Sequence, residues 1–174
     1  MIDPTWKRIA GFHLEDDGTL GAVWLAHDDI SSIVHLYDAA LFTREVPAVI
    51  CTGIAARGRH LPMAWRKKDE AMSEKLDEAG VYMLPDPSAD DPAMAEVISR
   101  DIWQRLRTGQ FRVEKRVGEW LEEYRKFYRD GQAIPKAGFP LMAATRHAIE
   151  MLPYATAEYS GRKSMSNHPT MSIV

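Results

Sequence analysis

The sequence has almost no cysteine and no long apolar run. Cys51 is its single cysteine, so the 174-residue chain cannot form an internal disulfide framework or a zinc site built on several cysteines. No apolar segment approaches the roughly 20 residues that cross a bilayer, and residues 1–7 lack the basic and then apolar order of a signal peptide. We therefore expect neither secretion nor membrane insertion, and a lone thiol suits a reducing compartment.

An excess of one charge is lacking as well. The chain carries 22 Lys and Arg against 25 Asp and Glu, which gives a formal net charge of -3. Because this overall field repels phosphate weakly, contact with nucleic acid would need a local basic face. The composition is 45% hydrophobic and 27% charged, which is typical of one globular domain of this length.

The first third of the chain alternates as short strands do. Apolar runs at 9–14, 20–26 and 33–37 are separated by acidic turns, which predicts an antiparallel meander. Between 44 and 84, helical and strand patterns alternate: helices at 44–57 and 71–78, strands at 61–65 and 81–84. Such alternation predicts strands added in parallel to the meander sheet.

The second half is mainly helical. Apolar stripes predict helices from 93 to the glycine at 109, from 117 to 128, and from 140 to 152, with a short edge strand at 111–113. Residues 156–174 show no periodicity and are interpreted as a flexible tail. The expected organisation is therefore one domain at 1–155 and a tail at 156–174.

A series of short blocks, in a fixed order, carries a resemblance to a known family. The blocks are Gly21–Ala26, Val34–Asp38, Ala55–Gly58, Leu61–Trp65, Met83–Pro85, Leu106–Phe111, Trp120–Arg125 and Leu141–Ala148. Together they make the region from about 6 to 155 resemble the C-terminal nuclease domain of the large terminase subunit of tailed bacteriophages. The terminase ATPase motor is absent, since no Gly-x-x-x-x-Gly-Lys-Ser/Thr motif occurs.

The resemblance implies an α/β, ribonuclease-H-like fold: a central mixed sheet, started by a three-stranded antiparallel meander, with helices on both faces. It also implies carboxylates that bind two divalent ions for cleavage of DNA. This sequence departs from the pattern at each acid position. His13 stands in the first, Lys68 in the second when no gap is introduced, and Phe139-Pro140 in place of the acidic pair before the last helix.

These substitutions argue against a metal pair. Replacing three acids by a neutral His, a Lys and a Pro changes the formal charge of the cluster from -3 to +1. Each like-charge contact at ~4 Å costs about 4 kcal/mol at an effective dielectric of 20, so no cofactor is expected. Two alternatives stay open: nearby acids, chiefly Asp17 and Asp69, could replace the lost ligands, and His13 with Lys68 could form an anion-binding pair.

The resemblance therefore predicts a degenerate, catalytically inactive domain with a binding or regulatory role in viral DNA packaging, in the cytoplasm of a bacterial host. The alternative is an active endonuclease with relocated ligands that needs Mg or Mn. Packaging proteins such as terminase or portal would bind the tail. The densest positive stretch would contact DNA weakly, unless it is only a solvated helix end; it comprises Arg105, Arg107, Arg112, Lys115 and Arg116.

Overall fold

A mixed sheet of seven strands organises the computed structural model, which describes residues 2–128 and 133–157. The predicted meander is confirmed, because β1, β2 and β3 pair antiparallel in succession. Two strands add in parallel beyond β1, and one adds in parallel beyond β3, which gives the order β5-β4-β1-β2-β3-β6. These strands are β1 (Lys7–Leu14), β2 (Thr19–Asp28), β3 (Ile33–Thr43), β4 (Met63–Arg66), β5 (Met83–Asp86) and β6 (Phe111–Val113).

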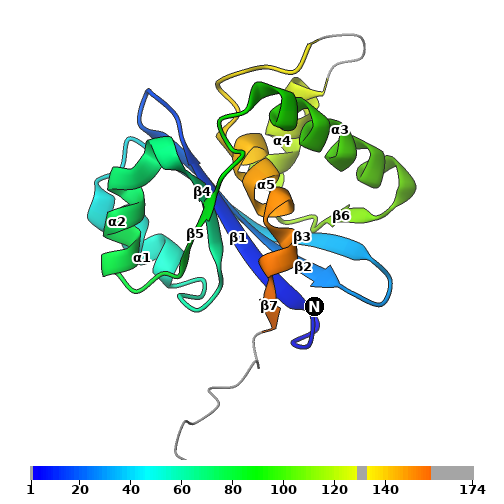
Figure 1. The fold of residues 1–174 in the computed structure, drawn as a ribbon, viewed down its shortest axis with the longest axis horizontal. Helices are drawn as coiled ribbons and strands as arrows, with labels where there is room; N and C mark the ends of the chain where they lie inside the picture. Colours follow the sequence, from blue (N-terminus) through cyan, green and yellow to red (C-terminus); the bar gives the residue numbers. More distant parts are fainter. Residues whose placement is uncertain (1, 129–132, 158–174) are drawn as a thin grey trace, which may run out of the picture.

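Helices cover both faces of the sheet, as Figure 1 shows, with α1 and α2 on one side and α3, α4 and α5 on the other. The first pair is α1 (Pro47–Ala55) and α2 (Glu70–Glu78), the latter preceded by the 3-10 turn η1 (Lys67–Asp69). The second group is α3 (Pro92–Thr108), α4 (Gly118–Phe127) and α5 (Pro140–Glu150), followed by η2 (Leu152–Tyr154). No helix within the described residues is long and apolar enough to cross a membrane.

The chain continues as a strand past the predicted end of the domain. Thr156–Ala157 form β7, which pairs antiparallel with the start of β1 at Arg8 and Lys7. A strand of two residues is too short to show an alternating pattern in the sequence, and its pairing depends on a partner about 150 positions away. The rest of the predicted tail, from Glu158 onward, lies outside the described residues.

The strand β3 is longer than predicted, and α1 is shorter. The strand extends to Thr43, and the next residue, Arg44, has a φ of 55° in the left-handed region, so the chain turns there. The helix then begins at Pro47 in place of Arg44, because proline suits the first helical position, where its missing N–H would have no partner.

Two apolar cores result from the alternation of side chains along the strands. On β1, Ile9 belongs to the core under α3, α4 and α5, whereas Ala10 and Phe12 belong to the core under α1 and α2. The stripe predicted on α4 is confirmed, since Trp120 is fully buried and its Nε1 donates a hydrogen bond of 2.9 Å to Thr145 Oγ1 on α5.

The helix α5 lies directly on the backbone of β1 and β2. A Cβ atom at Gly11 would lie 2.4 Å from the carbonyl oxygen of Ala144, and one at Gly21 would lie 2.6 Å from the carbonyl carbon of Pro140. Glycine at both positions therefore permits this close approach. Because side chains alternate along a strand, His13 shares the face of Gly11 and points toward α5.

Candidate functional site

The strands β1, β4 and β5 are neighbours and run parallel, so their carboxyl ends lie side by side at the same end of the sheet. Buried or half-buried polar side chains gather there under α5. We call this group the buried polar site; it consists of His13, Arg66, Asp69, Asp86 and His147.

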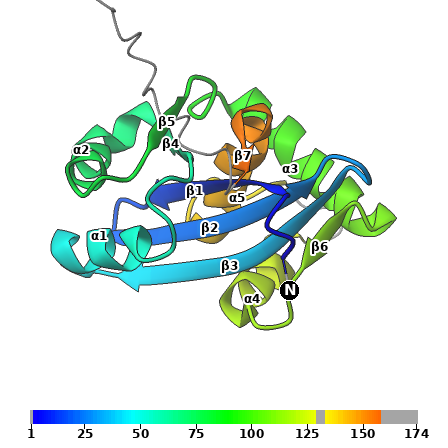
Figure 2. The same ribbon diagram turned by 90° about the horizontal axis from the view of Figure 1, so that it is seen from below.

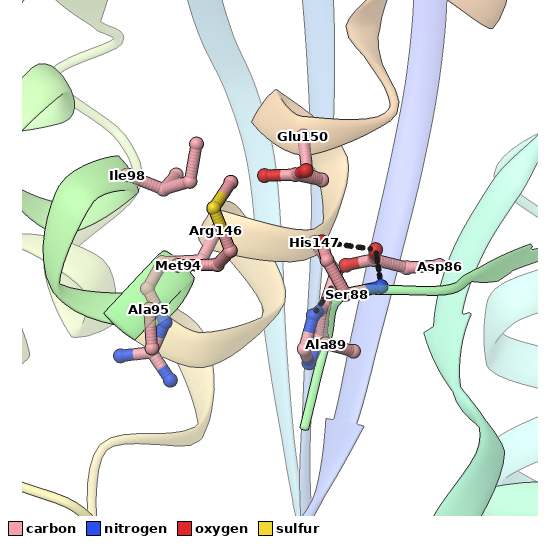
Figure 3. Close-up of a pocket in the computed structure, with 9 residues that line it drawn as sticks. All are labelled: Asp86, Ser88, Ala89, Met94, Ala95, Ile98, Arg146, His147 and Glu150. Carbon is pink, nitrogen blue, oxygen red and sulfur yellow. Dashed lines mark hydrogen bonds and ion pairs between the residues drawn. The ribbon is translucent and has the colours of Figure 1, made fainter. Parts of the chain in front are cut away.

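A chain of hydrogen bonds runs through one half of this site. Asp86 Oδ2 lies 3.2 Å from His147 Nδ1, and His147 Nε2 lies 3.1 Å from His13 Nδ1. Figure 3 shows Asp86 reaching His147 from the end of β5. Since an ionised carboxylate can only accept, His147 donates a hydrogen bond from Nδ1 to Asp86, and its Nε2 accepts a hydrogen bond from His13 Nδ1. These hydrogen bonds fix the tautomer of each neutral imidazole, with the proton on Nδ1 in both rings.

Burial keeps both imidazoles uncharged. It lowers the pKa of His13 to about 2, and the neighbouring His147 adds to this effect. Burial also lowers the pKa of His147, against the opposing effect of Asp86. Burial disfavours ionisation of Asp86, but its hydrogen bonds with His147 and Ser88 outweigh that cost, and its pKa is lowered. The side of His13 away from His147 faces Glu15, with 3.7 Å between His13 Nε2 and Glu15 Oε1.

An ion pair occupies the other half. Arg66 Nε lies 2.9 Å from Asp69 Oδ2, with side chains that are only 13% and 4% exposed. The same guanidinium donates from Nη2 to the carbonyl oxygen of Leu14 at the end of β1, and Asp69 Oδ2 also accepts from the Leu14 N–H. A fixed positive charge therefore bridges the ends of β4 and β1.

The 3-10 turn η1 decides which residue after β4 turns inward. Lys68 is exposed and forms an ion pair with Asp16 across 2.9 Å, with side chains 57% and 88% exposed. Asp69, the next residue, is buried. The Lys68 ammonium thus pairs with Asp16, whereas the His13 ring pairs with His147. Asp17, the other candidate replacement ligand, is an exposed turn residue whose carboxylate accepts from the Thr19 N–H.

At the start of α5, apolar residues stand where the resemblance expects acids. Pro140 is buried as the first helical residue, and the ring of Phe139 packs edge-on against Phe127 with 5.2 Å between ring centroids. A carboxylate does reach this helix end, but from α4: Glu123 Oε1 accepts a 2.8 Å hydrogen bond from the Met142 N–H. Burial raises the pKa of Glu123 to about 7.

The donor set does not suit a pair of hard divalent ions. No group of three or more His, Cys, Asp or Glu residues within the described residues could hold a metal ion. Asp69 is engaged by Arg66 and Leu14, and Asp86 by His147 and Ser88. Mg²⁺ and Mn²⁺ require oxygen ligands that are free to coordinate, and Arg66 adds a cation beside them. The chemistry that this arrangement supports is internal hydrogen bonding.

The five predicted DNA-binding residues separate into two groups. Arg105 Nε forms an ion pair of 2.7 Å with Asp101, and Arg107 lies over the ring of Trp103. The other three surround an open surface hollow beside β6. We call it the basic hollow; it is lined by His35, Arg112, Val113, Glu114, Lys115 and Arg116.

Sequence reasoning did not identify His147, Asp86, Arg66 or Glu123 as parts of a site. His147 lies 134 positions from His13 and 61 from Asp86, so no local spacing links the three. The one available signal was the block Leu141–Ala148, in which a polar His interrupts an apolar helix face. A polar residue on such a face needs a buried partner.

Among the solved structures with the same fold are nuclease domains of large terminases. The P22 large terminase nuclease domain has a TM-score of 0.80 at 18% identity, over 94% of this chain and 90% of that chain. The nuclease domain from bacteriophage SPP1 with bound Mn has a TM-score of 0.61 at 12% identity, over 84% and 85%. The Mn-soaked human cytomegalovirus terminase nuclease domain has a TM-score of 0.58 at 11% identity, over 85% and 84%.

No family model matches the chain, and no curated protein matches it. At these identities the structural likeness concerns the fold. The fold class expected from the resemblance, a ribonuclease-H-like α/β domain with a mixed sheet, is confirmed.

Proposed function

We propose that this chain is a phage terminase nuclease-like domain that lacks metal-dependent cleavage and keeps a binding role in viral DNA packaging. One observation carries the proposal: the Arg66 guanidinium bridges Asp69 and the end of β1, where the resemblance leads us to expect metal ligands. A half-buried cation there supplies internally the positive charge that a metal ion would bring. His13 is likewise engaged with His147.

The second candidate function is an active Mg- or Mn-dependent endonuclease with relocated ligands, and Asp69 favours it most. Its carboxylate is buried near the end of β1. Such an enzyme would have to displace Arg66 from Asp69 before a metal ion could bind. Asp17 would have to leave its hydrogen bond with Thr19.

The deciding experiment is plasmid nicking with Mg²⁺ or Mn²⁺, together with melting curves at increasing Mn²⁺ concentration. We expect no nicking and no metal-dependent rise in melting temperature for the unmodified chain. Mn²⁺-dependent nicking that Asp69→Asn or Asp17→Asn abolishes would establish the endonuclease instead.

A gain of metal binding tests the role of Arg66 directly. The double variant His13→Asp with Arg66→Gln removes the internal cation and places a carboxylate on β1 near Glu15 and Asp69. We expect Mn²⁺ to raise its melting temperature, because the ion would neutralise the carboxylates left without Arg66. His13→Asp with Lys68→Gln is the matched control, since it loses an equal charge from the exposed position. An equal response of both variants would contradict the assignment to Arg66.

The partner role is proposed for the C-terminal residues from Glu158 onward, with terminase or portal proteins as partners. Deletion of these residues should abolish capture of such a partner while the melting temperature stays unchanged, because their polar, aperiodic sequence is typical of a flexible tail.

A further inference from the structure

The basic hollow lies at the opposite edge of the sheet from the buried polar site. The strand β6 closes one edge beyond β3, whereas the buried polar site lies at the ends of β1, β4 and β5 toward the other edge. Figure 2 shows β6 and the loop that follows it at the side of the sheet away from β4 and β5. A ligand in the hollow would therefore not touch the buried polar site.

The cations of the hollow have no acidic ion-pair partner in the part of the chain that the structure describes. No carboxylate within residues 2–128 and 133–157 forms an ion pair with Arg112, Lys115 or Arg116. This contrasts with Arg105, which Asp101 neutralises on the neighbouring helix. Three positive charges thus face solvent around one concave surface, with Glu114 as the single acid in its lining.

Part of the hollow is held in a fixed conformation. Arg116 donates from Nε and Nη2 to the carbonyl oxygen of Tyr37 at 3.2 and 3.0 Å. The ring of His35 stacks on Trp6, with 4.5 Å between centroids. Burial and the neighbouring Arg112 lower the pKa of His35, so this wall is a neutral aromatic surface. Because these side chains are already held in place, less side-chain conformational entropy is lost when an anion binds.

We propose that the basic hollow binds the phosphates of a nucleic acid backbone, through Arg112 and Lys115 with Arg116 as the fixed element, and that Arg105 and Arg107 take no part. Guanidinium and ammonium groups bind phosphates without further anchors. An acidic peptide would need an apolar pocket for its anchoring side chains, and Val113 is the one aliphatic residue in this lining. The choice of nucleic acid rests on the proposed function.

The test measures binding of a fluorescent 30-base-pair duplex to the full chain by anisotropy, from 50 to 200 mM NaCl. Arg112→Gln with Lys115→Gln should lower the affinity about tenfold at 50 mM and reduce the slope of log K against log[salt] by about 2. Arg105→Gln with Arg107→Gln is the matched control, because it removes the same charge from the adjacent segment. The control should keep the slope of the unmodified chain.

Two results would overturn the proposal. One is an equal loss of affinity in both double variants, which would show a diffuse charge effect. The other is absence of duplex binding by the unmodified chain while labelled poly-glutamate binds and depends on Arg112 and Lys115, which would make the hollow a site for acidic protein. The nicking assay is independent of both results, so a failed pseudonuclease proposal and a failed phosphate site are distinguishable.

Discussion

The buried polar site and the basic hollow contain the same kinds of groups and use them in opposite ways. In the buried polar site, guanidinium, imidazole and carboxylate groups satisfy one another: Arg66 with Asp69, and His13 with His147 and Asp86. In the basic hollow, Arg112 and Lys115 remain without acidic partners among the described residues. Burial requires internal pairing of charges, whereas solvent tolerates cations that remain available to a ligand.

The largest expected effect is the difference in stability lost when a half-buried ion pair and an exposed ion pair in the same turn are removed. Arg66→Met should lower the free energy of unfolding by about 3 to 5 kcal/mol, because Asp69 would stay buried without its cation. Lys68→Met removes the exposed pair with Asp16 two residues later and should change stability by less than about 0.5 kcal/mol. Urea denaturation of both variants measures the difference.

A double variant distinguishes the cost of an unpaired charge from loss of packing. Arg66→Met with Asp69→Leu removes both charges, so most of the stability lost in Arg66→Met should return. If the double variant is as unstable as the single one, the Arg66 side chain contributes mainly through packing.

The next effect concerns acid sensitivity. His13 and His147 have lowered pKa values in the folded state, so the unfolded chain binds more protons below its histidine pKa of 6.5. Stability therefore falls as pH decreases below 6.5. Glu123 acts in the opposite direction: its folded pKa is about 7 against an ordinary 4.5, so its protonation stabilises the fold as pH decreases from 7 to 4.5.

The Glu123→Gln variant isolates these opposing contributions. The glutamine side chain still accepts a hydrogen bond from the Met142 N–H, but it cannot take up a proton. The stability of this variant should therefore fall more steeply as the pH decreases. Relative to the unmodified chain, its stability should fall by about 2 kcal/mol more between pH 7.5 and 5, at about 1.4 kcal/mol for each pKa unit. Melting curves across this range provide the measurement, with the exposed Glu122→Gln as control. Parallel curves for the Glu123 variant and the unmodified chain would show that this carboxyl is ionised in the fold.

The sequence predicts the two regions unequally, for a physical reason. The meander, the edge strand at 111–113 and the α4 stripe follow from local periodicity, which acts over a few residues. The inward turn of Asp69 depends on the 3-10 geometry of η1, and the His13–His147 contact depends on α5 settling on Gly11. Such long-range packing leaves no spacing pattern. The basic stretch was visible, and the spacing of Asp101 and Arg105 at i, i+4 on a helix even allows their pairing to be read locally. The hollow that places Arg112, Lys115 and Arg116 beside His35 of β3 depends on strand pairing and leaves no such signal.

The smallest effect concerns stability at the basic hollow. Arg112→Gln with Lys115→Gln should change the free energy of unfolding by less than about 0.5 kcal/mol, because both residues are exposed and neither forms an ion pair with another described residue. At 10 mM NaCl, where charges interact over about 30 Å, removal of their mutual repulsion should raise stability slightly; at 1 M NaCl, where the range is about 3 Å, the gain should vanish. Urea denaturation at both salt concentrations checks this. A loss above about 1 kcal/mol would mean that these cations stabilise the fold through internal contacts, which would contradict their availability for phosphate.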